Sequence, residues 1–249
     1  YAVEDAKNIA RMLETKLGFE KENIHILLNE EATLSNIKNI LFEVALNVDE
    51  NDRLLVFYAG HGQTLTLRKG GELGYLVPVD ANLDNLYATG LSMKTIKEIS
   101  DITPAKHTLF MVDACYGGVM TVGTRGLKKN EFSDEEKYLK KITSEPASQI
   151  ITAGGKGEKA QERAEWGSSA FTKELLSGIE DGFADADYDG YITADELGSF
   201  LSKRVFITSE ENQTPVSGRY GSGEGEFVFI NPAYVEEMAK EEEELNEEE

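Results

Sequence analysis

The sequence predicts an α/β fold in which a mostly parallel sheet is flanked by helices. Segments with apolar residues at helical spacing alternate along the chain with short apolar runs. Two of these runs, 53–60 ("RLLVFYAG") and 107–115 ("HTLFMVDAC"), are almost continuously apolar, as expected of parallel strands that are buried on both faces. The 249 residues are enough to bury a substantial core.

The first half of the chain begins with a helix over residues 3–17, where apolar side chains recur at helical spacing up to Gly18. "NIHILLN" (23–29) is predicted to be a short strand. Thr33 or Ser35 is expected to cap the next helix, whose apolar positions extend to Ala45. The first fully apolar strand, 53–60, follows this helix.

The second half continues the alternation. "GYLVPVD" (74–80) is predicted to be a strand, and Ser92 to start a helix that runs to about Asp101. The buried strand 107–115 comes next. The polar, charged segment 121–145 is predicted to be a long exposed loop. "SQIITAG" (148–154) is then expected to be a strand, followed by a helix near residues 169–181.

Charge and composition exclude several classes of partner. The net charge of −21 argues against binding to nucleic acid or to an anionic membrane, and favours cationic ligands. Part of the charge lies in an acidic tail, 233–249, which we expect to be a solvated helix end or the start of a linker. No apolar run approaches the ~20 residues that span a bilayer. A single cysteine, Cys115, excludes an internal disulfide and fits a reducing compartment, so a cytoplasmic location is expected.

Two of the apolar strands run into side chains suited to catalysis. The first ends at Gly60-His61-Gly62, and the second runs into Asp113-Ala114-Cys115. Ligands of open α/β sheets bind beyond the carboxyl ends of the strands, and an imidazole there can activate a thiol. A lone cysteine is more often a small core residue and a lone histidine a structural one, but their joint placement favours a catalytic pair. His25 and His107 lack glycine neighbours and are interpreted as structural.

The motifs "YAGHG", "YLVPVDA" and "VDACYGG" resemble the caspase-like cysteine peptidases, the clan of caspases, metacaspases and bacterial orthocaspases. The spacing of 54 residues between His61 and Cys115 is close to the ~50 of caspases. The resemblance extends to about residue 230 and implies a three-layer caspase-like domain over 1–232. It also implies a large-subunit-like part (about 1–125), an exposed linker (about 121–145) and a small-subunit-like part (about 146–232). The family's first core strand would lie upstream of Tyr1.

The resemblance also implies the roles of individual residues. Cys115 would be the nucleophile and His61 the general acid and base, while the N–H groups of Gly62 and Cys115 would form the oxyanion hole. Asp113 lies two residues before Cys115, so in an extended strand it would line the same pocket. Metacaspases, which cut after Arg or Lys, have aspartate at this position, whereas caspases have glutamine. The alternative is that Asp113 only accepts hydrogen bonds from nearby backbone. Metacaspases commonly have serine where Ala59 stands.

A second motif, residues 185–196 ("DADYDGYITADE"), matches the twelve-residue EF-hand loop and predicts bound Ca²⁺. Its predicted ligands are Asp185, Asp187, Asp189, the Tyr191 carbonyl and the bidentate Glu196, with Thr193 acting through water. Helices are expected on both sides of the loop. The alternative is an acidic surface turn that binds nothing. Ca²⁺ would serve either as a structural staple or as an activator.

The resulting hypothesis is a cysteine endopeptidase that cleaves protein or peptide substrates after Arg or Lys. The hypothesis includes modulation by calcium and self-processing at the basic residues between about Arg125 and Lys141. Two alternatives remain: a catalytically silent, calcium-dependent binding module with the same fold, and a thiol hydrolase that acts on small molecules. Domains upstream or downstream of this sequence are possible partners.

Overall fold

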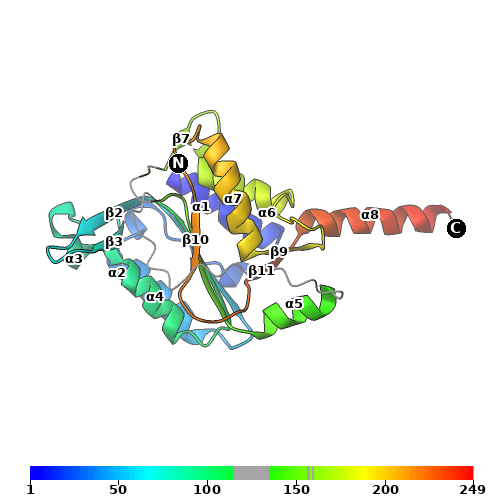
Figure 1. Ribbon diagram of the computed structural model, residues 1–249, viewed down its shortest axis with the longest axis horizontal. Coiled ribbons are helices and arrows are strands. Elements are labelled where there is room, and N and C mark those ends of the chain that lie inside the picture. Colours follow the sequence, from blue (N-terminus) through cyan, green and yellow to red (C-terminus); the bar gives the residue numbers. More distant parts are fainter. Residues whose placement is uncertain (115–134, 156–157, 159, 249) are drawn as a thin grey trace.

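A four-stranded sheet forms the centre of the molecule. The computed structural model describes residues 1–114, 135–155, 158 and 160–248. The strand order is β1 (Arg53–Ala59), β5 (His107–Asp113), β6 (Ala147–Thr152) and β10 (Val216–Arg219). The first three strands are parallel to one another and β10, labelled in Figure 1, is antiparallel to β6. The predicted α/β fold with a mostly parallel sheet is therefore confirmed.

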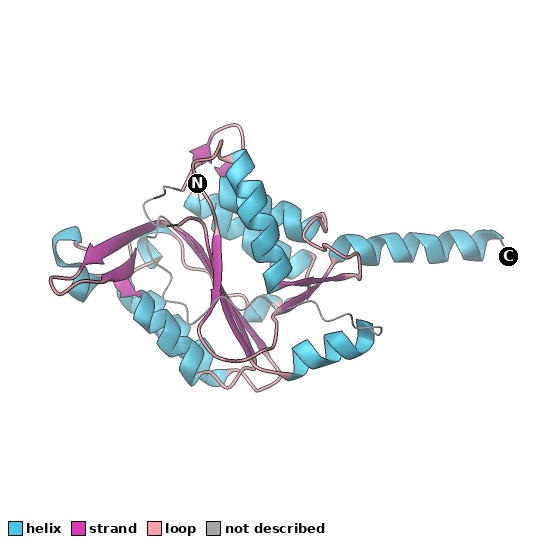
Figure 2. Cartoon of the chain, viewed as in Figure 1, coloured by secondary structure: helices cyan, strands magenta, loops and turns pink. Residues whose placement is uncertain are grey.

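Helices cover both faces of this sheet and give it three layers (Figure 2). All seven residues of β5 are buried, and they alternate between two separate cores. Leu109 and Met111 pack with the helices α1 (Ala2–Thr15), α6 (Ala170–Glu180) and α7 (Ala194–Thr208). Phe110 and Val112 pack with α2 (Leu34–Asn47) and α4 (Met93–Ile102) on the other face. The continuous apolar run of the sequence thus reflects burial on both faces.

The capping residues start the helices close to the predicted positions. The hydroxyl of Thr33 accepts a hydrogen bond from the Asn36 amide (3.2 Å) at the start of α2. Ser92 caps α4 in the same way, and Ser169 caps α6. Each hydroxyl satisfies a backbone amide that has no partner within its own helix.

A second, three-stranded antiparallel sheet follows β1. It consists of β2 (His61–Thr66), β3 (Glu72–Val77) and β4 (Leu91–Ser92). A short 3-10 turn, η3 (Leu83–Asn85), and the helix α3 (Leu86–Thr89) connect β3 to β4. The strand expected at 74–80 is therefore present in part, but it belongs to this sheet and not to the central one.

Two predictions about local structure are wrong. Residues 24–28 lie between the 3-10 turns η1 (Lys21–Asn23) and η2 (Asn29–Glu31), and they pair with no strand of the described chain, so the predicted strand does not form. The predicted loop 121–145 contains the helix α5 (Glu135–Ser144) in its described part. Ile142 of α5 is 2% exposed, and its carbonyl accepts a hydrogen bond from the Glu226 amide (2.9 Å). This packing fixes a helix in a sequence that is mostly charged.

The C-terminal part adds two short ribbons and a long helix. One ribbon pairs β7 (Glu162–Arg163) with β8 (Ser168–Ser169), and the other pairs β9 (Tyr191–Thr193) with β11 (Val228–Ile230). The acidic tail forms α8 (Pro232–Glu248), which projects from the body of the molecule (Figure 1). Among the helices described, none is long and apolar enough to cross a membrane.

Candidate active site

The carboxyl ends of β1 and β5 lie side by side. Ala59 is in register with Asp113, and the Gly60 amide donates a hydrogen bond to the Asp113 carbonyl (3.0 Å). His61 therefore emerges at the edge of the sheet where β5 ends. Cys115, the predicted nucleophile, lies outside the described residues, which stop at Ala114 on this strand.

His61 is exposed and begins β2, so its imidazole is accessible to a substrate. The hydroxyl of Tyr58 lies 3.1 Å from the carbonyl of His61 and 3.1 Å from that of Val77. Burial raises the pKa of Tyr58 to about 12, so this hydroxyl keeps its proton and donates. A Cβ atom on Gly60 would lie 2.9 Å from the same hydroxyl. The glycine before His61 thus lets Tyr58 reach and fix the backbone of His61.

Gly62 is the second residue of β2 and pairs with Leu76 of β3. Its predicted partner in the oxyanion hole, the amide of Cys115, is not among the described residues. His25 is exposed and lies apart from these strands in the sequence. His107 is buried at the start of β5, where its Nε2 lies 3.1 Å from the Glu145 carbonyl, and burial lowers its pKa. The interpretation of His107 as structural fits these contacts.

Asp113 is buried at the end of β5, with 4% of its surface exposed. Its Oδ2 accepts hydrogen bonds from the hydroxyls of Ser169 and Thr172, the latter at 2.8 Å. Its Oδ1 is also buried and has no hydrogen-bond partner among the described residues. Burial raises the pKa of Asp113 to about 6, although the two hydroxyls act in the opposite direction. The bonds come from side chains at the start of α6 and not from nearby backbone.

A second buried carboxylate, Asp5 of α1, lies close to Asp113, since both bond to Ser169, and it was not singled out from the sequence. Asp5 is 1% exposed, and its Oδ2 accepts a hydrogen bond from the Ser169 amide (3.4 Å). Its Oδ1 likewise lacks a hydrogen-bond partner in the part of the chain that is described. Burial raises the pKa of Asp5 to about 7, and the negative charge of Asp113 raises it further. The sequence did carry one signal, since Asp5 shares the helix face of the buried Ile9 and Met12.

We call this pair, Asp5 and Asp113 joined through Ser169, the acidic pocket. Two buried carboxylate oxygens without donors are costly, because each has lost its contacts with water and gained nothing in exchange. Residues that lower stability in this way concentrate at functional sites. A ligand that carries several N–H donors and a positive charge would satisfy both oxygens.

The predicted calcium loop lies between α6 and α7, as expected. One carboxylate oxygen from each of Asp185, Asp187 and Asp189 lies within 4.8 Å of the others. Burial raises the pKa of Asp189 to about 6, and the neighbouring carboxylates add to this effect. Glu196 closes the loop, since its Oε1 accepts a hydrogen bond from the Ala186 amide (3.3 Å). An all-oxygen donor set with unbalanced negative charge fits Ca²⁺.

Two other elements hold this loop in place. Tyr191 and Thr193 belong to β9, which pairs with β11 from the end of the domain. Asn231, directly after β11, donates a hydrogen bond to Oδ2 of Asp185 (2.9 Å), and both side chains are buried. The end of the domain therefore holds the loop in two ways, through the pairing of β11 with β9 and through Asn231.

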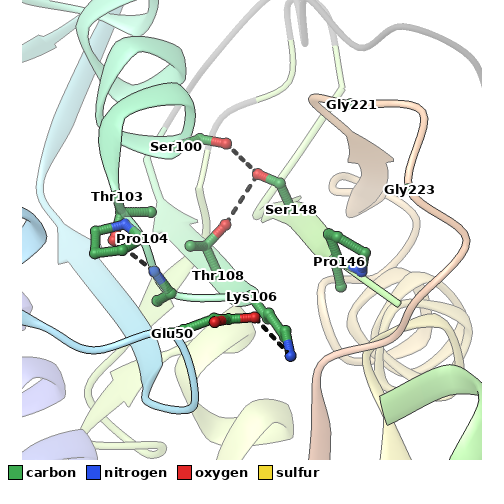
Figure 3. Close-up of a pocket in the computed structure, with 12 residues that line it drawn as sticks. Glu50, Ser100, Thr103, Pro104, Lys106, Thr108, Pro146, Ser148, Gly221 and Gly223 are labelled. Atoms are coloured by element: carbon green, nitrogen blue, oxygen red, sulfur yellow. Dashed lines mark hydrogen bonds and ion pairs between the residues drawn. The ribbon is translucent and has the colours of Figure 1, made fainter. Parts of the chain in front are cut away.

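A separate cavity of about 430 Å³ lies at the opposite edge of the sheet, where β5 and β6 begin (Figure 3). Its hydroxyls bond to one another, Ser148 with both Ser100 and Thr108. Lys106 pairs with Glu50 at 2.8 Å. These polar groups already have partners, so we assign the cavity no catalytic role.

Comparison with known proteins identifies the family. The model of the caspase domain matches residues 1–215. This chain belongs to the caspase-domain family. Metacaspase-4 of Arabidopsis thaliana is 26% identical over 207 residues, and a probable protease of a Desulfuromonadales bacterium is 30% identical over 180 residues. The matches cover 72% and 67% of this chain, but only 47% and 21% of those two relatives.

A solved structure supports the fold of this caspase domain. A protein from Geobacter sulfurreducens superimposes with a TM-score of 0.57 and 17% identity, covering 86% of this chain and 82% of that one. The resemblance found in the sequence motifs is therefore confirmed at the level of family and fold.

Proposed function

We propose that this caspase domain is a cysteine endopeptidase that cleaves after Arg or Lys. The observation that carries the proposal is the acidic pocket, which lies at the same edge of the sheet as His61. A guanidinium or ammonium group supplies the donors and the positive charge that the free oxygens of Asp5 and Asp113 lack. A small-molecule thiol hydrolase would not need a pocket for such a group. The relatives named as a metacaspase and a probable protease also favour a peptidase.

In this proposal His61 takes the proton of the Cys115 thiol, and the thiolate attacks the carbonyl carbon of the scissile amide, while the amides of Gly62 and Cys115 stabilise the oxyanion. The carbon–nitrogen bond then breaks as His61 gives its proton to the leaving amine. Water hydrolyses the resulting thioester, and His61 takes up the proton that the water loses. The thiol is restored at the end of the cycle.

The proposal predicts the outcome of a positional-scanning library of fluorogenic peptides. We expect turnover only where Arg or Lys precedes the cleaved bond, because other side chains leave the carboxylates of the pocket unpaired. Aspartate at that position should give no turnover. A preference for aspartate would contradict our assignment of the pocket, and absence of cleavage from every peptide would favour the silent binding module.

We further propose that residues 185–196 bind Ca²⁺ and that binding promotes self-processing. Bound Ca²⁺ would neutralise the clustered carboxylates and stabilise the fold by RT ln(1 + [L]/Kd), about 2.7 kcal/mol at a hundredfold excess over Kd. The helix α5, which follows the segment with the basic residues, lies within electrostatic range of this loop. Burial raises the pKa of Tyr138 in α5, and the carboxylates of Glu226 and Glu196 raise it further.

A buried polar network connects the loop to the central sheet as well. Arg219 of β10 pairs with Glu226 and also with Asp195 (3.2 Å), which is a member of the loop. Gln149 of β6 donates a hydrogen bond to the same Glu226 (2.6 Å). The Glu226 amide also bonds to the Ile142 carbonyl of α5. Direct contacts therefore connect the loop, through Glu226, to both α5 and β6.

Calcium is expected to accelerate cleavage of the chain between about Arg125 and Lys141. Intact-mass analysis over time, with Ca²⁺ or with a chelator, should show faster nicking with Ca²⁺ for the wild type. Glu196→Gln should remove this difference, because it removes the bidentate ligand of the loop. Glu43→Gln, an equivalent change on the exposed face of α2, should behave as the wild type. If the rate of nicking is the same with Ca²⁺ and with chelator, and the same in Glu196→Gln, the loop has only a structural role.

A further inference from the structure

A third carboxylate, Glu162, lies beside the acidic pocket on the β7–β8 ribbon. Glu162 is directly opposite Ser169 in the antiparallel register. Side chains of directly opposed residues project from the same face of a ribbon. Since the Ser169 hydroxyl bonds to Asp113, Glu162 is on the face of the ribbon that is turned to the pocket.

The ribbon is fixed at its base, which makes the position of Glu162 well defined. The amide of Gln161 donates a hydrogen bond to Oε1 of Gln213 (2.8 Å). Gln213 is fully buried, and its Nε2 donates to the carbonyl of Ala153 (2.7 Å), just after β6. The position of Glu162 is thus tied to the central sheet.

Glu162 differs from the other two carboxylates in its exposure. Asp5 and Asp113 are buried, whereas 48% of the Glu162 side chain is exposed. Its Oε2 lies 3.7 Å from the backbone nitrogen of Tyr1. Its charge contributes to the raised pKa values of both buried carboxylates. Glu162 is therefore a rim residue within electrostatic range of the pocket.

The charges of the site indicate what the rim carboxylate would bind. One basic side chain of the substrate supplies the donors for the two buried oxygens, and Glu162 remains available. In an extended peptide, residues two apart face the same way and lie about 6.6–6.8 Å from each other. A second basic side chain on the same side of the peptide would therefore approach the rim.

We propose that Glu162 is a specificity residue that favours substrates with a second Arg or Lys two positions before the one at the cleaved bond. This inference rests on the proposed function, because it takes the acidic pocket as the site of the first basic residue. Glu165 provides a matched control: it lies in the turn of the same ribbon, is exposed, and contacts Arg163 at 3.4 Å. Arg163 is opposite Ser168, and its side chain stacks on Trp166 at 4.8 Å.

The test compares two fluorogenic peptides that both end in Arg at the cleaved bond and differ only by Arg or Gln two positions earlier. We expect the wild type to prefer the Arg peptide about two- to fivefold in kcat/KM, the range of a partly exposed ion pair. Glu162→Gln should bring this ratio close to one, whereas Glu165→Gln should leave it unchanged. High salt should also reduce the wild-type ratio.

The outcomes separate the two proposals. If the wild type cleaves both peptides with a ratio of one, or if Glu162→Gln keeps the wild-type ratio, the inference about Glu162 is wrong and the proposed function stands. A preference for a basic residue one position, and not two positions, before the Arg at the cleaved bond would also contradict it. If neither peptide is cleaved, the proposed function fails and the inference fails with it.

Discussion

Cys115→Ala is expected to abolish peptide hydrolysis while the protein remains folded. An alanine methyl group fills most of the space of the thiol but cannot attack a carbonyl carbon. His61→Ala should reduce the rate by several orders of magnitude, beyond the ~10²–10⁴ of acid–base catalysis alone, because the thiolate also loses its activation. The exposed position of His61 at the end of β1 leaves its imidazole accessible for both tasks.

The measurement is kcat/KM on an Arg peptide, with circular dichroism to check the fold. His25→Ala is the matched control, since His25 is exposed and belongs to the segment between η1 and η2, not to β1 or β5. It should keep the wild-type rate. Near-normal turnover by purified Cys115→Ala or His61→Ala would exclude the proposed mechanism.

Asp113→Asn should lower kcat/KM for basic substrates by tens- to thousands-fold, the cost of losing a desolvated ion pair of about 2–5 kcal/mol. Asp5→Asn is expected to act in the same direction, because its carboxylate lines the same pocket and shares Ser169 with Asp113. Asp101→Asn, which alters an exposed carboxylate on α4, serves as the control for the change in charge. Equal activity of Asp113→Asn and Asp101→Asn on Arg peptides would contradict the role of the pocket.

Asp113→Asn should not destabilise the substrate-free protein at neutral pH. The pKa values of Asp113 (about 6) and Asp5 (about 7) are raised above the ordinary value of 3.8 by burial. The contribution of these two carboxyl groups to the free energy of unfolding is therefore fully present below about pH 4, where both are protonated, and is lost as the pH rises through 6 to 7. Urea unfolding measures the free energy of unfolding of both proteins at pH 5 and pH 8. From pH 5 to pH 8, that of Asp113→Asn should rise relative to that of the wild type by at least about 1 kcal/mol. An equal difference at both pH values would argue against the buried charge.

The parts of the fold that could be predicted depend on local patterns. The apolar runs of β1 and β5 indicated parallel strands buried on both faces, and Ser92 and Ser169 lie at helix starts close to those expected. The parallel register then brings His61 and Asp113 to one edge, as the sequence indicated.

The errors have physical causes that lie outside any local window. Residues 24–28 have strand-like composition, but no strand of the described chain offers them hydrogen bonds. The helix α5 is held by a hydrogen bond between Ile142 and Glu226, which lies 84 positions later. Asp5 looked like an ordinary acidic residue in the first turn of α1, and only the folded chain brings it to Ser169, 164 residues away. The grouping of Asp185, Asp187 and Asp189 could be predicted because these residues are close in sequence, whereas the contact with Asn231 could not.

The central claim is that Cys115 attacks substrates whose basic side chain occupies the acidic pocket. One measurement tests both parts: mass spectrometry of the protein after exposure to two peptide electrophiles, identical except for a terminal Arg or Asp. The account predicts a covalent adduct on Cys115 with the Arg reagent, little with the Asp reagent, and a loss of this preference in Asp113→Asn. Equal labelling of wild-type Cys115 by both reagents, or no labelling by either, would contradict it.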